Sequence, residues 1–213
     1  VEKNLFIISN YLGKKLPGSI LITSNKSLNS KFKNLKIVNP KHNIENSSFK
    51  RLKFLFCIIE LIKMLKENKN YLVFSFQANL YCSIICRIFG IKVIVRSNSA
   101  PVGWSQNKFK KIIFKFVLKL ADQIMVNSIE FKKDLKKEFN VNAVCIYNPL
   151  NHKDIISKSC KKSITIFKSN NKLRILNVGR FVDQKDQITL LKALNIIKNY
   201  IKFEAVIIGK GIL

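Results

Sequence analysis

Short apolar runs alternate with longer amphipathic segments along the first 150 residues. The runs, each predicted as a strand, are 19–23, 35–39, 71–76, 91–96, 123–126 and 143–147. The longer segments, each predicted as a helix, are 2–15, 49–67, 78–89, 108–120 and 130–139. Gly90 is predicted to end the third helix, and the run at 91–96 to be a central strand. Because parallel neighbours need crossover connections, the alternation predicts an α/β fold with a doubly wound parallel sheet.

The composition changes after this region. Residues 151–171 are polar, with clusters of Lys, Ser and Asn, and are predicted to be a linker. Residues 172–213 then give strand, helix and strand again, which predicts the first β-α-β of a second Rossmann-like domain. The predicted organisation is therefore a first domain at 1–150, a linker, and the start of a second domain.

The turn after the first strand of that second domain is a candidate anion site. Gly179 and Arg180 follow the strand, and Lys185 comes five residues after Arg180. Ligands of such folds bind at the carboxyl ends of the strands, where helix N-termini attract anions. Glycine is expected to let the backbone turn sharply, and the two cations are expected to clamp a diphosphate. The alternative is a pair of solvated cations in a lysine-rich protein.

The charge balance allows several partners. The formal net charge is +27, from 39 basic and 12 acidic residues. Only five basic residues are Arg, whereas proteins that read bases rely on the Arg fork. An A/T-rich codon bias would also explain many of the lysines. The rest of the positive charge is interpreted as a surface suited to anionic lipid or phosphorylated substrates. A basic nucleic-acid-binding protein is the alternative hypothesis.

The cysteines and histidines give little sign of a metal site. Cys82 and Cys86 share one helix face, but no second pair accompanies them, so a buried apolar role in a reducing cytoplasm is expected. His42 and His152 each stand alone in polar stretches and are expected on the surface. The most apolar helix is interrupted by Lys53, so no membrane span is predicted.

Helix 108–120 is a candidate for contact with a membrane surface. Its main stripe is predicted to pack on the sheet and consists of Phe109, Ile112, Ile113, Phe116, Val117 and Leu120. Phe114 and Leu118 lie outside that stripe, next to Lys111 and Lys115. Apolar residues flanked by lysines are typical of a helix that lies on anionic lipid. A broad core face with a solvated lysine face is the alternative.

The order of these motifs resembles the retaining GT-B glycosyltransferases of family 4. The segment from Val178-Gly179-Arg180 through Lys185 to Val206-Ile207-Ile208-Gly209-Lys210-Gly211 resembles the start of that family's C-terminal domain. Upstream, the segments 121–128 and 146–150 resemble the end of its N-terminal domain. Val1-Glu2 resembles the tail of a Gly-Gly-x-Glu loop, which places the first strand and its glycines before Val1. The resemblance covers the whole chain.

The resemblance implies an enzyme that transfers a sugar from a UDP- or GDP-sugar with retention of configuration. Arg180, Lys185 and the turn at Gly179 correspond to the residues that hold the donor diphosphate. No Asp-x-Asp triplet is present, so a reaction without metal or other cofactor is expected. The expected setting is the cytoplasm, peripherally on the inner face of the cell membrane, in the assembly of a cell-surface polysaccharide or lipid-linked glycan.

Further residues are implied for the acceptor side. The turn after strand 91–96 contains Ser97, Asn98 and Trp104, which are expected to border the sugars together with Glu2. A plain loop with an anchoring Trp is the alternative. Asp186 stands where the family often has Gly and is expected to act at a helix start. The family's paired glutamates have no counterpart in the 213 residues, so this chain alone is expected to be inactive, and a non-catalytic remnant is a further alternative.

Overall fold

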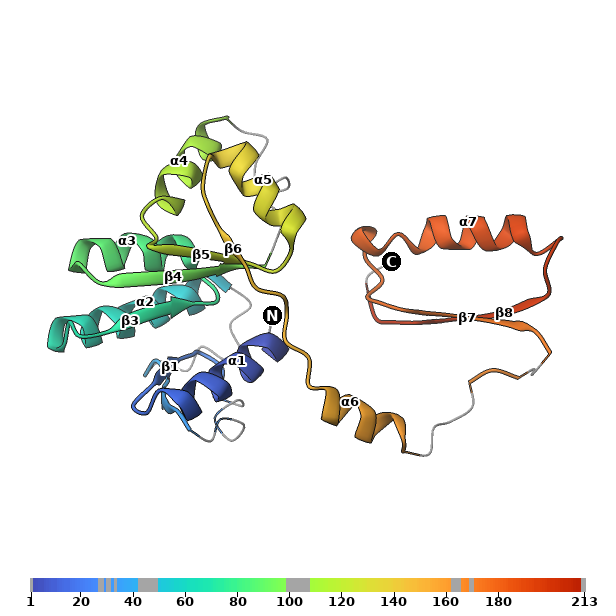
Figure 1. The fold of residues 1–213 in the computed structure, drawn as a ribbon, viewed down its shortest axis with the longest axis horizontal. Coiled ribbons are helices and arrows are strands. Elements are labelled where there is room, and N and C mark those ends of the chain that lie inside the picture. The colour runs from blue at the N-terminus through green and yellow to red at the C-terminus, as the bar shows by residue number, and fades with distance from the viewer. Residues whose placement is uncertain are drawn as a thin grey trace. The chain divides into compact units, whose positions relative to one another are not determined.

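The computed structural model describes residues 2–26, 29, 32, 34–41, 50–98, 108–161, 166–168 and 171–211, with the backbone alone at 2, 3, 50, 51 and 110. The chain divides into two units, Val1–Asn151 and His152–Leu213 (Figure 1). Both units are built from parallel strands connected by helices. The α/β fold that the sequence predicts is therefore confirmed.

The elements of unit 1 follow the predicted alternation closely. They are α1 (Glu2–Lys15), β1 (Ile20–Ile22), β2 (Lys36–Val38), α2 (Lys50–Glu67), β3 (Leu72–Ser75), α3 (Asn79–Phe89), β4 (Lys92–Ser97), α4 (Lys108–Leu118), β5 (Gln123–Val126), α5 (Ile129–Phe139) and β6 (Val144–Cys145). Gly90 ends α3 in the left-handed conformation, with φ of 70°, as predicted. Ser128 begins α5 by accepting a hydrogen bond from the Phe131 N–H at 3.0 Å.

The main sheet of unit 1 has the strand order β3-β4-β5-β6, and all its neighbours are parallel. β1 and β2 form a separate parallel pair. The strands β3 to β6 follow one another across the sheet in chain order, and a helix connects each strand to the next. Because such crossovers are right-handed, α3, α4 and α5 lie on the same face of the sheet (Figure 1). α3 contacts α4, and α4 contacts α5, within that helical layer.

The core of unit 1 is centred on β4, the predicted central strand. Val93 and Val95 have no exposed surface, and Leu65 of α2 and Leu135 of α5 are equally enclosed. Burying each such side chain stabilises the fold by about 1.5–3 kcal/mol. Asp122 connects the next crossover to this strand, since its carboxylate accepts a hydrogen bond from the Val93 N–H at 2.7 Å. These contacts fix the position of the carboxyl end of β4.

Helix α4 packs with a different face from the one predicted. Val117 and Leu118 are buried and Phe114 packs against the core, whereas most of the predicted sheet-facing stripe is exposed. The exposed members of that stripe are Phe109, Ile112, Ile113 and Phe116. The assignment of Phe114 and Leu118 to a membrane contact is therefore wrong.

The physical reason lies on α5. The Lys111 ammonium pairs with the Glu138 carboxylate and lies 5.8 Å from the centre of the Phe139 ring. This pair lowers the pKa of Glu138 through its hydrogen bond and charge. Because α4 is apolar over most of its circumference, its own pattern allows more than one rotation, and the neighbouring helix selects one.

Unit 2 contains α6 (His152–Ser159), β7 (Leu173–Val178), the 3₁₀ turn η3 (Asp183–Lys185), α7 (Gln187–Ile197) and β8 (Phe203–Ile208). β7 and β8 are parallel neighbours along six residue pairs, which confirms the predicted β-α-β. The segment predicted as a linker contains α6, an exposed helix with an ion pair between Lys158 and Asp154 at 2.9 Å. His152 at its start is exposed, whereas His42 lies outside the described residues.

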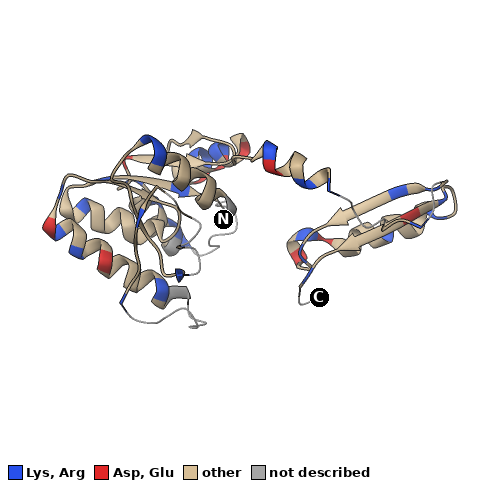
Figure 2. Cartoon of the chain, turned by 90° about the horizontal axis from the view of Figure 1, so that it is seen from below, with Lys and Arg blue, Asp and Glu red and all other residues tan. Residues whose placement is uncertain are grey.

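Burial is distributed unequally between the units. Among the described residues, all buried apolar side chains lie in unit 1, whereas the buried residue of unit 2 is Gln187. Leu176 and Val178 of β7 remain exposed although they belong to a strand. Two strands and one helix do not enclose a core by themselves. Basic positions are distributed over the helices and connections of both units in the view of Figure 2.

The contribution of the core can be measured on one helix. Leu65→Ala removes a fully buried side chain of α2 and is expected to lower the free energy of unfolding by about 2–5 kcal/mol. Leu55→Ala in the same helix is the matched control, because Leu55 is 53% exposed, and it is expected to cost about 0.5 kcal/mol. Urea titration followed by fluorescence measures both. Equal losses would contradict the described core.

The different burial of the cysteines predicts how fast each thiol reacts. Cys82 and Cys86 are buried, as predicted, whereas Cys160 is exposed. Burial raises the pKa of Cys86 from 9.0 to about 12, so its thiol stays neutral in the folded protein near pH 8. Cys160 is expected to react rapidly with a thiol reagent there, and Cys82 and Cys86 only after unfolding.

The pH dependence follows from the same shift. The pKa of the Cys86 thiol is higher in the folded than in the unfolded protein, so the folded protein keeps the thiol proton up to a higher pH. The stability from the neutral Cys86 thiol is therefore full below pH 9 and lost as the pH rises toward 12. Comparing Cys86→Ala with the parent by urea titration across that range measures the difference. A parallel pH dependence in the two proteins would contradict the assignment.

Candidate functional site

The predicted anion site lies where β7 and β8 end. The Gly179 N–H donates to the Ile208 carbonyl at 2.9 Å, and the Phe181 N–H donates to the Lys210 carbonyl at 3.0 Å. The two strands thus continue side by side past their last regular residues. Both segments open at the carboxyl edge of a parallel sheet, which is the ligand-binding edge of such folds. Charged positions of both signs lie at this end of unit 2 (Figure 2).

Two glycines after β8 allow this close approach. A Cβ on Gly209 would lie 1.9 Å from the Gly179 carbonyl oxygen, and one on Gly211 would lie 1.9 Å from the Phe181 carbonyl oxygen. Gly179 itself has no such need, because a Cβ there would make ordinary contacts and its φ lies outside the left-handed region. The prediction that Gly179 supplies a sharp turn is therefore wrong. Glycine is required on the neighbouring segment instead.

Lys185 returns to the end of β7 through the turn η3. The Lys185 N–H donates to the Val182 carbonyl at 2.8 Å. Its Cγ and Cδ lie 3.7 and 3.9 Å from the position that a Cβ on Gly179 would take. Arg180 and Lys185 are both exposed, and neither has an ion pair within the described residues. The structure thus brings the Lys185 side chain beside Gly179, the residue that precedes Arg180 in the chain. Both charged side chains are accessible to solvent.

Asp186 has the helix-start role that the sequence predicts. It adopts the left-handed conformation with φ of 45°, which Asp tolerates better than most residues. Its carboxylate accepts a hydrogen bond from the Thr189 N–H at 3.2 Å and caps α7. This contact directs the negative charge toward the helix start. Asp183, at the start of η3, is an exposed acid near the two cations.

Gln187 belongs to this site, although no sequence pattern marks it. Its side chain is buried, and its Nε2 donates to the Arg180 carbonyl at 2.9 Å. This bond ties the first turn of α7 to the segment that follows β7. Its Oε1 has no hydrogen-bond partner within the described residues. The role depends on how η3 folds back, which local spacing does not reveal.

The end of β4 in unit 1 is held by a buried arginine. Arg96 donates through Nη2 to the Ile146 carbonyl and to the Asn148 side-chain oxygen, each at 3.1 Å. The Asn79 amide in turn donates to the Arg96 carbonyl at 3.0 Å. Burial lowers the pKa of Arg96. The carboxyl ends of β4 and β6 are thereby joined.

The predicted acceptor-side residues lie partly at this end. Ser97 is buried and Asn98 is half-buried, with an Oδ1 that has no partner within the described residues. Trp104 and the side chain of Glu2 lie outside the described residues. The structure thus places Ser97 and Asn98 at a strand end, as expected, and bears on neither Trp104 nor the Glu2 side chain.

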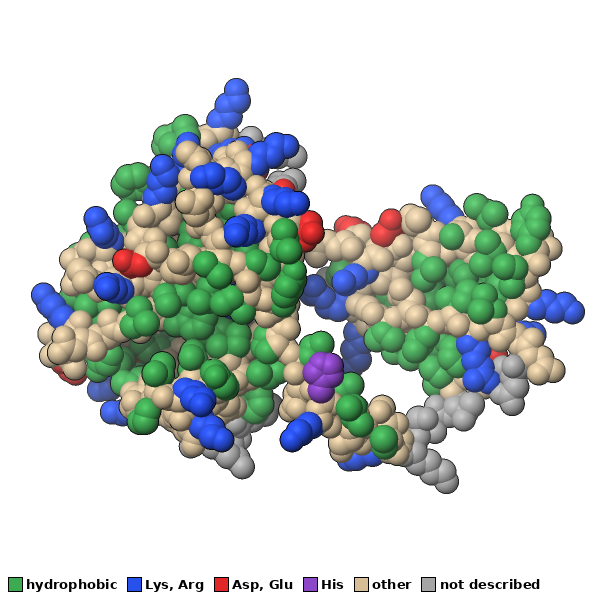
Figure 3. All heavy atoms as spheres, viewed as in Figure 1, with side chains coloured by type: hydrophobic (Ala, Val, Ile, Leu, Met, Phe, Trp, Pro, Cys, Tyr) green, Lys and Arg blue, Asp and Glu red, His purple; other side chains and the backbone are tan. Residues whose placement is uncertain are grey.

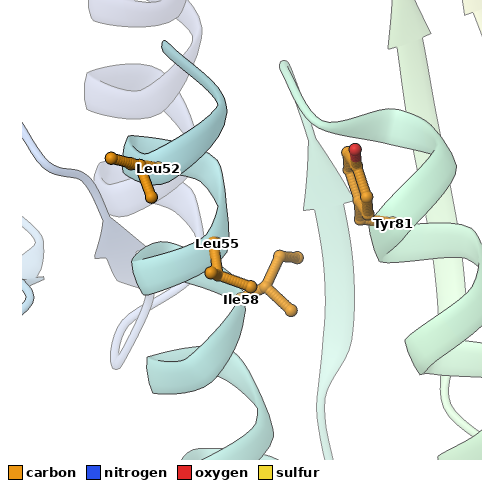
Figure 4. A pocket seen from close by; sticks show the side chains of 4 residues that line it. All are labelled: Leu52, Leu55, Ile58 and Tyr81. Atoms are coloured by element: carbon orange, nitrogen blue, oxygen red, sulfur yellow. The ribbon is translucent and has the colours of Figure 1, made fainter. Parts of the chain in front are cut away.

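An apolar hollow lies elsewhere in unit 1. It measures about 240 Å³ and is lined by Leu52, Leu55 and Ile58 of α2 and by Tyr81 of α3 (Figure 4). Leu55 and Ile58 lie on the side of α2 toward Tyr81 in this view. None of the predicted site residues lines it. Its walls carry no cation and do not suit a diphosphate.

The described residues offer no candidate metal site and no candidate membrane span. They contain no group of three or more His, Cys, Asp or Glu side chains placed to hold a metal ion. Of the helices in the described ranges, none combines the length and the apolar character required to span a bilayer.

Comparison with known proteins identifies a related fold. No family model and no curated protein matches the chain. Two solved structures of Alr3699/HepE from Anabaena are similar over 99% of this chain: the complex with UDP and glucose, with a TM-score of 0.60 and 13% identity, and the complex with UDP, with a TM-score of 0.61 and 12% identity. The chain spans 58% of the length of those proteins. At this identity the likeness establishes the fold, which is Rossmann-like α/β.

Proposed function

We propose that the protein is a glycosyltransferase that binds a UDP- or GDP-sugar through the end of β7. Arg180 and Lys185 hold the donor diphosphate, and the backbone at Gly179 lies beside it. The observation that carries the proposal is the pair of exposed cations, neither engaged in an ion pair within the described residues, at the carboxyl edge of a parallel sheet. Two cations at the ligand-binding edge of a parallel sheet can form charge-assisted hydrogen bonds with a diphosphate.

The chemistry explains why cations are needed here. When the bond between the sugar C1 and the donor oxygen breaks, its electron pair stays on the nucleoside diphosphate. Positive groups that contact this leaving group stabilise the charge as it develops. The start of α7 adds partial positive charge from its free N–H groups. No metal ion is needed in this scheme, because Arg180 and Lys185 supply the charge.

The solved structures with the same fold support this proposal. The HepE crystals contain UDP, and one also contains glucose. A nucleoside diphosphate and a sugar are the two parts of a nucleotide-sugar donor. The order of motifs from Val178 to Gly211, which resembles the family 4 enzymes, leads independently to the same class of substrate.

The proposal also covers the acceptor and the stereochemical outcome of the transfer. We infer transfer with retention to a glycan or lipid-linked acceptor, in the making of a cell-surface polysaccharide on the inner face of the membrane. Asn98, after the end of β4, has a side-chain oxygen without a partner in the described residues and can accept a hydrogen bond from a sugar hydroxyl. Ser97, which is buried, and Trp104 and Glu2 are assigned to the same side by resemblance. The coupling constant of the anomeric proton in an isolated product tests retention.

Donor binding is the direct test. Isothermal titration of the chain with UDP-glucose, UDP and glucose is expected to show binding of the two nucleotides and none of glucose. Arg180→Ala and Lys185→Ala are each expected to weaken UDP binding about tenfold to a hundredfold, because each removes a charge-assisted hydrogen bond. Lys198→Ala and Lys202→Ala, at exposed lysines of the same unit, are matched controls that keep the parent affinity.

Other outcomes would contradict the proposal. UDP affinity that is the same in the Arg180 and Lys185 variants and the controls would remove these cations from the site. Tight binding of RNA or DNA that falls steeply with salt, without binding of UDP, would favour the nucleic-acid alternative. Circular dichroism of each variant confirms that a loss of binding is not a loss of fold.

A further inference from the structure

The helical layer of unit 1 presents apolar side chains to the outside. Exposed aromatic and aliphatic residues occupy the outward arcs of both α3 and α4, and we name this set the α3–α4 face. It consists of Ile84, Ile88, Phe109, Ile112, Ile113 and Phe116. Ile88 is 71% exposed, Phe109 is 70% exposed, and Ile112 and Phe116 are each 65% exposed. An exposed group of large apolar residues on neighbouring elements marks an interaction surface.

The face follows from how the two helices pack. Cys82 and Cys86 of α3, and Val117 and Leu118 of α4, point into the core. Since α3 and α4 contact each other on the same side of the sheet, their opposite arcs point outward together. Figure 1 shows the two helices in this layer. A helix that is apolar on both its inner and its outer arc needs a second apolar environment.

Lysines border the face, and no acid lies on its helices. Lys108 and Lys115 are exposed and lie four and three residues from Ile112, and Lys119 lies three residues after Phe116. Such spacing puts them on the adjoining helix face. Neither α3 nor α4 contains an Asp or Glu. Figure 3 shows hydrophobic groups projecting among Lys and Arg side chains at the end of unit 1 where α4 lies.

We propose that the α3–α4 face docks on an anionic lipid surface. An interfacial helix lies in the membrane plane, with apolar side chains among the acyl chains and lysines at the headgroups. Each lysine close to an anionic bilayer strengthens the attachment. The apolar residues and the single sign of charge on these helices match both requirements.

A second copy of the chain is a poorer occupant of this face. A symmetric dimer would bring the same lysines of both copies together, with no carboxylate on α3 or α4 to pair with them. Nucleic acid is a poorer occupant too. Phe109 and Phe116 offer flat rings, but the other four members of the face are isoleucines, which have neither a charge nor a ring for stacking on bases. The inference does not depend on the proposed sugar transfer, although it would bring the enzyme to a lipid-linked acceptor.

Vesicle flotation tests the apolar part of the proposal. The whole chain is expected to float with mixed phosphatidylcholine and phosphatidylglycerol vesicles and to stay behind with pure phosphatidylcholine. The variant Phe109→Ser, Ile112→Ser, Phe116→Ser is expected to bind the mixed vesicles at least about tenfold more weakly. The matched control is Ile188→Ser, Leu191→Ser, Ile196→Ser, which removes comparably exposed apolar groups from α7 and is expected to bind like the parent.

A second set of variants tests the charges. Lys108→Glu, Lys115→Glu, Lys119→Glu is expected to abolish flotation, whereas Lys192→Glu, Lys198→Glu, Lys202→Glu changes exposed lysines of unit 2 and is expected to retain most of it. Equal losses in the two sets would mean general attraction of a basic protein and would overturn the proposal. The proposal would also fail if the serine variant of α4 floated normally but lost self-association in sedimentation velocity. Circular dichroism verifies that each variant is folded.

Discussion

Parallel pairing of the strands is the constraint on which the rest of the structure depends. A parallel neighbour can be reached only by a connection that returns across the sheet, so β3, β4, β5 and β7 are each followed by a helix before the next strand. The same constraint gathers the carboxyl ends of the strands in each unit at one edge. Arg96 and Asn98 lie at that edge in unit 1, and Arg180 lies there in unit 2. The chemistry proposed for the protein is thus positioned by sheet topology.

The two units support their strand ends by different means. In unit 1 a buried core surrounds β4, and the enclosed guanidinium of Arg96 fixes the neighbouring segment after β6. In unit 2 close backbone contact replaces the core. Gly209 and Gly211 let the segment after β8 lie against the segment after β7, and Gln187 ties α7 to it. A short, open α/β unit can in this way still hold two cations in a defined place.

Within unit 1, the same helical layer forms the α3–α4 face and follows the strand ends of the sheet. The crossovers that order the strands also place α3 and α4 side by side, so that two amphipathic helices present one outward face. If the α3–α4 face lies on lipid, the two helices that contact the lipid are those that follow the carboxyl ends of β3 and β4. Binding to a membrane and binding of a donor then use separate residues, and each can be changed without altering the other.

The sequence by itself determined the order and type of the elements, the left-handed Gly90 cap and the capping role of Asp186, because these depend on local spacing and backbone preference. It also identified Arg180 and Lys185 as neighbours of a strand end. Only the tertiary structure decided the rotation of α4, since a helix that is apolar around most of its circumference takes its orientation from Glu138 and Phe139 on α5. The need for glycine at 209 and 211, and the role of Gln187, were likewise decided there. They arise where segments distant in sequence meet, and no local pattern records such a meeting.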